Sequence, residues 1–237
     1  MKLGIKIYPK LKEGKYVEYF VKNKITDFVE VMSIKGTDYG FLKKYKTPWV
    51  IHSSHHVVGT FIANPDREEQ SMGALRFTQK LADDFSSKFI IVHPSSPSGK
   101  NDIETTISIL KKINDKRILI ENVVNKFGGD FEGVERVIKE TGSGFCLDIP
   151  HAIAAAKIRG IDYMDYIKQF LKLKPKMVHI SDGYIDSKID KHLNFGEGDF
   201  PWKKLLRLIP KNVLVTVETN PVIETQKKNF EFLRKNL

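Results

Sequence analysis

The sequence predicts an α/β fold, and more closely a (β/α)8 TIM barrel formed by a single domain over residues 1–237. Short runs rich in Ile, Val, Leu and Phe recur eight times, with segments of helical period between them. Several of these runs are almost wholly apolar, which is typical of strands buried on both faces of a parallel sheet. A chain of 237 residues also has the usual length of one such barrel.

Eight strands are expected, and most of them end on a polar residue. They are Leu3–Ile7, Asp27–Met32, Trp49–His52, Phe89–His93, Arg117–Asn122, Gly144–Asp148, Met177–Ile180 and Val213–Glu218. The second strand has the weakest pattern, and the loop after it is rich in Lys, Gly and Tyr.

Helices are expected in the segments between the strands. The clearest patterns cover Asp66–Phe85, Asp102–Ile113, Phe131–Glu140 and Asp162–Leu173. Asp66 and Asp162 are the expected N-caps of two of them. An open, doubly wound sheet is the alternative fold, but no Gly-x-Gly-x-x-Gly turn follows the first strand, which disfavours its dinucleotide-binding form.

Composition excludes several classes of protein. The lone Cys146 excludes a disulfide framework and a thiolate zinc cluster, and a hydrophobic share of 41% argues against a disordered chain. No apolar run approaches the roughly 20 residues that a membrane span needs, and no signal peptide is evident, so we expect a soluble, cytoplasmic monomer. The 39 Lys and Arg against 29 Asp and Glu give a net charge of +10, which permits a polyanionic partner without requiring one.

Six consecutive strands end on or beside an imidazole or a carboxylate. The residues are His52, His93, Glu121, Asp148 with His151 close behind it, His179 and Glu218. The carboxyl ends of all strands in a parallel barrel open on one face, so these side chains should converge. One such residue alone is more often a hydrogen-bonded rim residue, but several buried carboxylates together require cations. Histidine and carboxylate without thiolate suit zinc or manganese.

The loop after the seventh strand contains a second concentration of polar residues. Asp190 and His192 are two residues apart, so they would project to one side of an extended segment; a surface turn is the alternative for this pair alone. Gly196 and Gly198 would permit a tight backbone path before a helix near Trp202.

From about Trp49 to Asn220 the chain resembles the endonuclease IV group of the xylose-isomerase-like barrel superfamily. The resemblance rests on these motifs: Ile51-His52 with Ala63-Asn64-Pro65-Asp66, His93-Pro94, Glu121-Asn122, Cys146-Leu-Asp148-Ile-Pro-His151-Ala152, His179-Ile-Ser-Asp182, Asp190-Lys-His192, Gly196-Glu-Gly198 and Val217-Glu218-Thr219.

The resemblance implies up to three bound zinc ions, with manganese as the alternative metal. Their ligands would be His52, His93 and Glu121 for the first; Glu121, Asp148, His179 and Glu218 for the second; and His151, Asp190 and His192 for the third. Glu121, as the bridging ligand, and Glu218 would be the catalytic residues. The implied activity is metal-dependent hydrolysis of a phosphodiester, on DNA with abasic sites during base excision repair or on another phosphorylated substrate, because zinc lowers the pKa of bound water to about 7.

Three departures from the group concern contacts with DNA more than the metals. The first strand, Leu3-Gly4-Ile5-Lys6-Ile7, lacks the histidine of the group's Gly-x-His motif, residues 33–39 contain no arginine, and His55 replaces an aromatic residue. His55 and His56 are expected to be exposed loop residues, with a place in the cleft as the alternative.

Two other functions remain open at this point. Sugar isomerases and epimerases of the same superfamily use one metal, held by the set that matches Glu121, Asp148, His179 and Glu218, and their two glutamates move a proton next to a carbonyl. That reading leaves the other five positions less well explained. The third possibility is a basic barrel that binds nucleic acid or a phosphorylated ligand without turnover.

Overall fold

The eight strands form a closed parallel barrel in chain order, with β1 paired to β8. The structure is a computed structural model that describes residues 1–9, 13–55, 59–96 and 99–236. Its strands are β1 Lys2–Ile7, β2 Phe28–Ser33, β3 Trp49–Ser53, β4 Ile90–Val92, β5 Ile118–Glu121, β6 Gly144–Asp148, β7 Met177–Ile180 and β8 Leu214–Val217. Closure between β1 and β8 confirms the barrel and excludes the open sheet.

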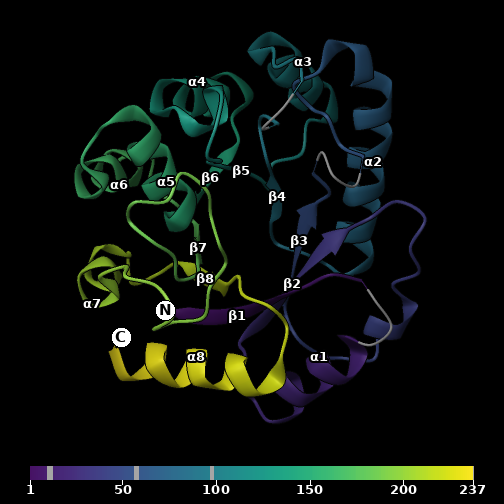
Figure 1. Cartoon of the computed structure of the whole chain (residues 1–237). Coiled ribbons are helices and arrows are strands. Elements are labelled where there is room, and N and C mark those ends of the chain that lie inside the picture. The colour runs from purple at the N-terminus through teal and green to yellow at the C-terminus, as the bar shows by residue number, and fades with distance from the viewer. Residues whose placement is uncertain (10–12, 56–58, 97–98, 237) are drawn as a thin grey trace.

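Helices surround the strands on the outside (Figure 1). They are α1 Glu13–Lys22, α2 Glu68–Asp84, α3 Ile103–Ile113, α4 Phe131–Thr141, α5 Ile149–Arg159, α6 Tyr163–Leu171, α7 Trp202–Leu205 and α8 Ile223–Asn236. The four helices expected from the sequence correspond to α2, α3, α4 and α6. Helix α5 shows why others were missed: its sequence is apolar on most sides and six of its residues from Ile149 to Ala155 are buried, so it has little amphipathic pattern.

One of the two expected N-caps is wrong. The Asp162 side chain accepts a hydrogen bond from the Asp165 backbone N–H at 3.0 Å and caps α6, as expected. Asp66 instead lies inside a short 3-10 turn, Pro65–Arg67, and the Asn64 side chain caps that turn by accepting from the Asp66 N–H at 3.0 Å. The proline favours the first position of the turn, so the cap moves to the residue before it.

The barrel interior has an apolar floor with a polar layer above it. The floor consists of Phe28, Val50, Ile91, Leu119, Cys146 and Met177, all buried. Side chains two residues apart in a strand point to the same face, so each strand places its next inward side chain closer to the carboxyl end. These residues are Glu30, His52, His93, Glu121, Asp148 and His179. Strand geometry therefore gathers the polar side chains at one end of the barrel.

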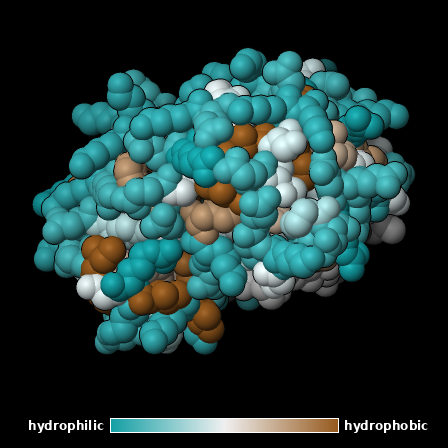
Figure 2. Space-filling model, turned by 90° about the horizontal axis from the view of Figure 1, so that it is seen from above, coloured by the Kyte–Doolittle hydropathy of each residue, from teal (hydrophilic) through white to brown (hydrophobic). Residues whose placement is uncertain are grey.

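Figure 2 shows how hydrophilic and hydrophobic residues are distributed over one face of the molecule. Seen from above, it is mostly hydrophilic, and hydrophobic residues gather only in small groups (Figure 2). None of the helices in the described part of the chain has the length and apolar character needed to cross a bilayer.

Candidate metal centre

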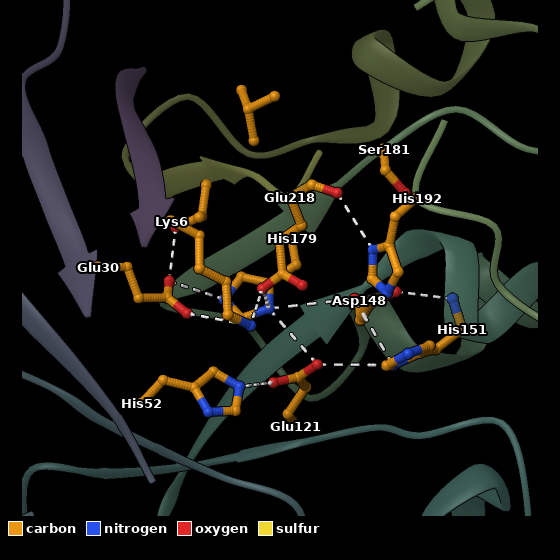
Figure 3. A network of polar contacts seen from close by, with 12 residues as sticks. Lys6, Glu30, His52, Glu121, Asp148, His151, His179, Ser181, His192 and Glu218 are labelled. Carbon is orange, nitrogen blue, oxygen red and sulfur yellow. Dashed lines mark hydrogen bonds and ion pairs between the residues drawn. The ribbon is translucent and has the colours of Figure 1, made fainter. Parts of the chain in front are cut away.

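The predicted site residues meet at the carboxyl end of the barrel. Figure 3 labels His52, Glu121, Asp148, His151, His179, His192 and Glu218, whose side chains are directed toward a common region. His93 and Asp190 join them through contacts with Glu121 and His192. Taken by the predicted sets, the nine side chains form three groups that overlap, because His151 Nδ1 lies 3.5 Å from both Glu121 Oε1 and Asp148 Oδ2 of the second set.

The first group joins two imidazoles to one oxygen of Glu121. Oε2 of Glu121 lies 3.1 Å from His52 Nε2 and 3.2 Å from His93 Nε2. His52 Nδ1 donates to the Ser53 carbonyl at 2.7 Å, which leaves the Nε2 lone pair of the neutral ring facing the carboxylate. Burial, aided by the charge of Lys6, lowers the pKa of His52, so the ring favours its neutral form. Two acceptor atoms then face each other, an arrangement that a shared cation stabilises.

The second group surrounds the buried ring of His179. Its Nδ1 lies 2.7 Å from Glu218 Oε1, 3.4 Å from Glu121 Oε1 and 4.0 Å from Asp148 Oδ2. Glu121 therefore presents one carboxylate oxygen to each of the first two groups. On the other side of the ring, His179 Nε2 lies 3.1 Å from Glu30 Oε2. This partner holds the ring so that Nδ1 faces the three carboxylates.

The third group is wider: His151 lies in the first turn of α5, and Asp190 and His192 lie on the loop after β7. His151 Nε2 is 3.9 Å from Asp190 Oδ2, and His192 Nδ1 is 3.3 Å from the same oxygen. The expectation of an extended segment for this pair is wrong: the Asp190 carboxylate accepts from the His192 N–H at 2.9 Å, and His192 has a φ of 47°. The two side chains share one region because a tight turn places them there.

Asp182 fixes the loop that carries Asp190 and His192. Its carboxylate accepts hydrogen bonds from the backbone N–H groups of Gly196 at 2.8 Å and Gly198 at 3.0 Å, and from Trp202 Nε1 at 3.2 Å. A Cβ at Gly198 would lie 2.1 Å from the Gly183 carbonyl oxygen, so only glycine fits there. The tight path expected from the two glycines is confirmed.

Unsatisfied buried atoms test whether these residues fit a metal. Among the residues that the structure describes, four buried ligand atoms have no aligned hydrogen-bond partner: His93 Nε2, Glu121 Oε1, His179 Nδ1 and Asp190 Oδ2. They include at least one atom from each group. Such atoms are rare in folded proteins and require an explanation, for which a bound ion is one. The imidazole and carboxylate donors therefore fit divalent zinc or manganese.

The crowding of carboxylates around Asp148 also favours a bound cation. Burial, together with the charges of Glu121, Asp190 and Glu218, raises the pKa of Asp148 well above its ordinary value. This crowding of carboxylates is relieved by bound cations. Cys146 also lies near His179 and Glu121, but burial raises the pKa of its thiol to about 12. A protonated thiol is a poor ligand, so the imidazoles and carboxylates remain the donor set.

Three buried residues that support the centre, Glu30, Thr216 and Lys6, are not among those expected from the sequence. Glu30 holds His179, and its Oε2 also accepts from Thr216 Oγ1 at 2.7 Å. Lys6 contacts Glu218 at 2.5 Å. The period-two pattern would have identified both charged residues, because Glu30 follows Phe28 and Lys6 follows Gly4 on the inner face of their strands.

Asn122, which the sequence associated with Glu121 only as a motif partner, links two neighbouring segments. Its side chain donates to the Asp148 carbonyl at 2.9 Å and accepts from the Asp148 N–H at 2.8 Å. Its own carbonyl accepts from His151 Nδ1 at 2.9 Å. One asparagine thus positions a ligand of the second group and a ligand of the third.

Two hollows open beside the centre. One of about 300 Å³ is lined by His55, His93, Ser95, Val123, Val124, Asn125, His151, Ile189, Asp190 and His192. The other, of about 80 Å³, is lined by Lys6, Tyr8, His192, Glu218, Thr219, Asn220 and Pro221. His55 is half-buried in the first hollow and its ring stacks on His93 at 5.9 Å, so the expectation that it is exposed is wrong. His56 lies outside the described residues.

The fold is a barrel that gathers side chains able to hold a metal ion at the carboxyl ends of its strands. Residues 40–236 match the model of the xylose isomerase-like TIM barrel family, and the chain belongs to that family.

Two solved structures and a curated relative are similar to this chain. It is 27% identical over 224 residues to a probable endonuclease 4 of Halothermothrix orenii, covering 81% of this chain and 78% of the relative. Endonuclease IV from Thermus thermophilus superposes with a TM-score of 0.77 at 19% identity, covering 100% and 98% of the two chains. A D-tagatose 3-epimerase-like protein gives 0.76 at 18% identity, covering 100% and 97%. At these identities the structural likenesses show the fold alone.

Proposed function

We propose that this chain is a zinc-dependent phosphodiester hydrolase that cleaves DNA at abasic sites, in the manner of endonuclease IV. The observation that carries the proposal is the set of three adjacent ligand groups, with Glu121 shared between the first two at 3.1 Å from His52 and 3.4 Å from His179. A one-metal enzyme would need only the second group. The relative named probable endonuclease 4 supports the same reading.

The nine predicted residues would hold the metals as three sets. These are His52, His93 and Glu121; Glu121, Asp148, His179 and Glu218; and His151, Asp190 and His192. Bound zinc would supply a water of lowered pKa and a positive charge for the phosphate. Glu121 would bridge the first two sets and Glu218 would complete the second, and these are the two residues that we propose as catalytic.

The surrounding side chains hold the ligands in place before any substrate arrives. His52, His151 and His192 each direct Nδ1 to a backbone carbonyl, those of Ser53, Asn122 and Glu218, at 2.7, 2.9 and 3.1 Å. This leaves Nε2 of His52 facing Glu121 and Nε2 of His151 facing Asp190. Preorganised ligands of this kind avoid the cost of rearrangement during the reaction.

The larger hollow and the net positive charge are suited to one sugar phosphate unit of a nucleic acid chain. Val123, Val124 and Ile189 give the larger hollow apolar walls next to His93, His151 and His192. These walls would contact the sugar, while the centre would take the phosphate. The net charge of +10 favours approach of a nucleic acid.

A nicking assay tests the proposal. Purified protein loaded with zinc is mixed with a duplex oligonucleotide that contains one abasic site. We expect a single nick on the 5′ side of the lesion, loss of nicking with EDTA and recovery with added zinc. A fully metallated protein that leaves the abasic duplex intact would refute DNA as the substrate.

The second candidate is a sugar or sugar phosphate isomerase or epimerase. It is favoured by the second group, which by itself has the composition of a one-metal site, with carboxylate oxygens of Glu121 and Glu218 at 3.4 and 2.7 Å from His179 Nδ1. The fold shared with an epimerase-like protein is compatible with it. Exchange of solvent deuterium into the carbon next to the carbonyl of a ketose would indicate this reaction, and the hydrolase would show none.

A further inference from the structure

Lys6 is a buried cation placed within the proposed metal centre. It projects from β1 toward the barrel axis and is 7% exposed. Its Nζ lies 2.5 Å from Glu218 Oε1, and the same oxygen lies 2.7 Å from His179 Nδ1 (Figure 3). The ammonium thus occupies part of the coordination space of a carboxylate that the second metal would need.

A second carboxylate lies within reach of the same ammonium. Glu30 Oε1 is 3.6 Å from Lys6 Nζ. This oxygen is buried and has no aligned hydrogen-bond partner among the described residues, whereas Glu30 Oε2 is already held by His179 and Thr216. Glu30 therefore offers Lys6 another acceptor on the side away from Glu218.

Lys6 stays charged in this setting. Its ammonium lies within ion-pair distance of two carboxylates, at 2.5 Å from Glu218 Oε1 and 3.6 Å from Glu30 Oε1, and both favour the charged form of the lysine. A permanent positive charge beside Glu218 repels a divalent ion and competes for the same oxygen.

We propose that Lys6 is a resident cation that competes with the second metal for Glu218, and that Glu30 receives Lys6 when that metal binds. The set of Glu121, Asp148, His179 and Glu218 then binds its ion more weakly than the same four ligands would without the lysine. The proposal rests on the proposed metal centre, but it does not depend on the substrate. Lys6 and Glu30 act here as residues that set metal occupancy.

The two residues have opposite expected effects, which gives a sharp test. Removing the ammonium by Lys6→Met should strengthen the weakest zinc-binding step at least tenfold. Glu30→Gln keeps an acceptor for His179 but removes the charge that receives Lys6, so it should weaken that step at least threefold. In the double variant no lysine remains to be displaced, so Glu30→Gln should lose most of its effect.

Zinc affinity is measured by competition with a chelating dye, and zinc content by elemental analysis after dialysis at buffered free zinc. Lys6→Arg retains the charge and should behave like the wild type, and Lys2→Met, at the exposed start of the same strand, is the matched control. Circular dichroism shows whether each variant is folded, and Lys6→Gln replaces Lys6→Met if the latter does not fold.

Equal zinc affinity in the wild type and the Lys6 variants would overturn the proposal. So would weakening by both Lys6→Met and Glu30→Gln, because that result would make them two parts of one structural support. Failure of the nicking assay would leave these zinc measurements unaffected, so the two proposals fail separately.

Discussion

Asp182 is expected to govern both the stability of the loop after β7 and the third metal group. The residue is 2% exposed, and its Oδ2 alone accepts the N–H groups of Gly196 and Gly198 at 2.8 and 3.0 Å. Asp182→Asn preserves the shape but replaces one carboxylate oxygen with an NH2 group. If the NH2 group takes the place of Oδ2, it cannot accept from the N–H groups of Gly196 and Gly198. If the amide is turned over, the NH2 group instead faces the donors of Gly183 and Trp202.

The expected loss of stability is calculated from the two hydrogen bonds from Gly196 and Gly198 that the NH2 group cannot accept when it replaces Oδ2. Hydrogen bonds to a charged group contribute about 1.5–3 kcal/mol each, so the free energy of unfolding should fall by about 3–6 kcal/mol. For a chain of this size that corresponds to a melting temperature lower by at least about 6 °C. Because the loop positions Asp190 and His192, zinc at the third group should bind at least about tenfold more weakly.

Urea unfolding and zinc titration measure the two effects on the same samples. Asp186→Asn is the matched control, because Asp186 lies in the same loop with its side chain 88% exposed and paired only to a surface lysine among the interactions described; it should change stability by less than about 0.5 kcal/mol. If Asp182→Asn lowers the free energy of unfolding by less than about 1 kcal/mol, no more than the control does, the carboxylate does not hold this loop.

Three further outcomes are expected. Glu121→Gln should reduce nicking by at least about a thousandfold while circular dichroism remains unchanged, because the amide keeps the shape and loses the bridging charge; activity within a few-fold of the wild type would contradict the bridging role. EDTA should lower the melting temperature by several degrees and zinc should restore it, since a ligand bound only by the folded state stabilises it; identical curves would argue against a built metal site. Cys146, whose burial raises its pKa to about 12, should not react with a thiol reagent in the native protein at pH 8 and should react fully in denaturant; rapid native reaction would show that the barrel floor is open.

The barrel was predictable because strand burial leaves a direct trace in the sequence. Runs such as Phe89–Val92 and Ile118–Ile120 are apolar on both faces, and the polar residue that follows each run marks the open end of the strand. Convergence of the ligands then follows from parallel topology alone. Their division into three metal sets came from the family resemblance and stays a prediction: the structure brings the nine side chains to one end of the barrel, where His151 contacts Glu121 and Asp148 as well as Asp190.

Other features depend on contacts that no local pattern encodes. Lys6 and Glu30 lie 24 positions apart, on neighbouring strands that pair at these two residues, and their ion pair exists only because the barrel brings them together. The turn at Asp190 and His192 depends on Asp182 and the glycines around it, which override the extended geometry that two-residue spacing suggests. The helix over Ile149–Arg159 is buried on most sides, so amphipathic periodicity could not reveal it.

The number of zinc ions per chain tests the central claim most directly. Elemental analysis after zinc loading and removal of loosely held metal should give more than one equivalent, and up to three, falling by at least one when Glu121 is replaced by glutamine. One equivalent or fewer, unchanged by that replacement, would contradict a multinuclear centre and favour the one-metal isomerase.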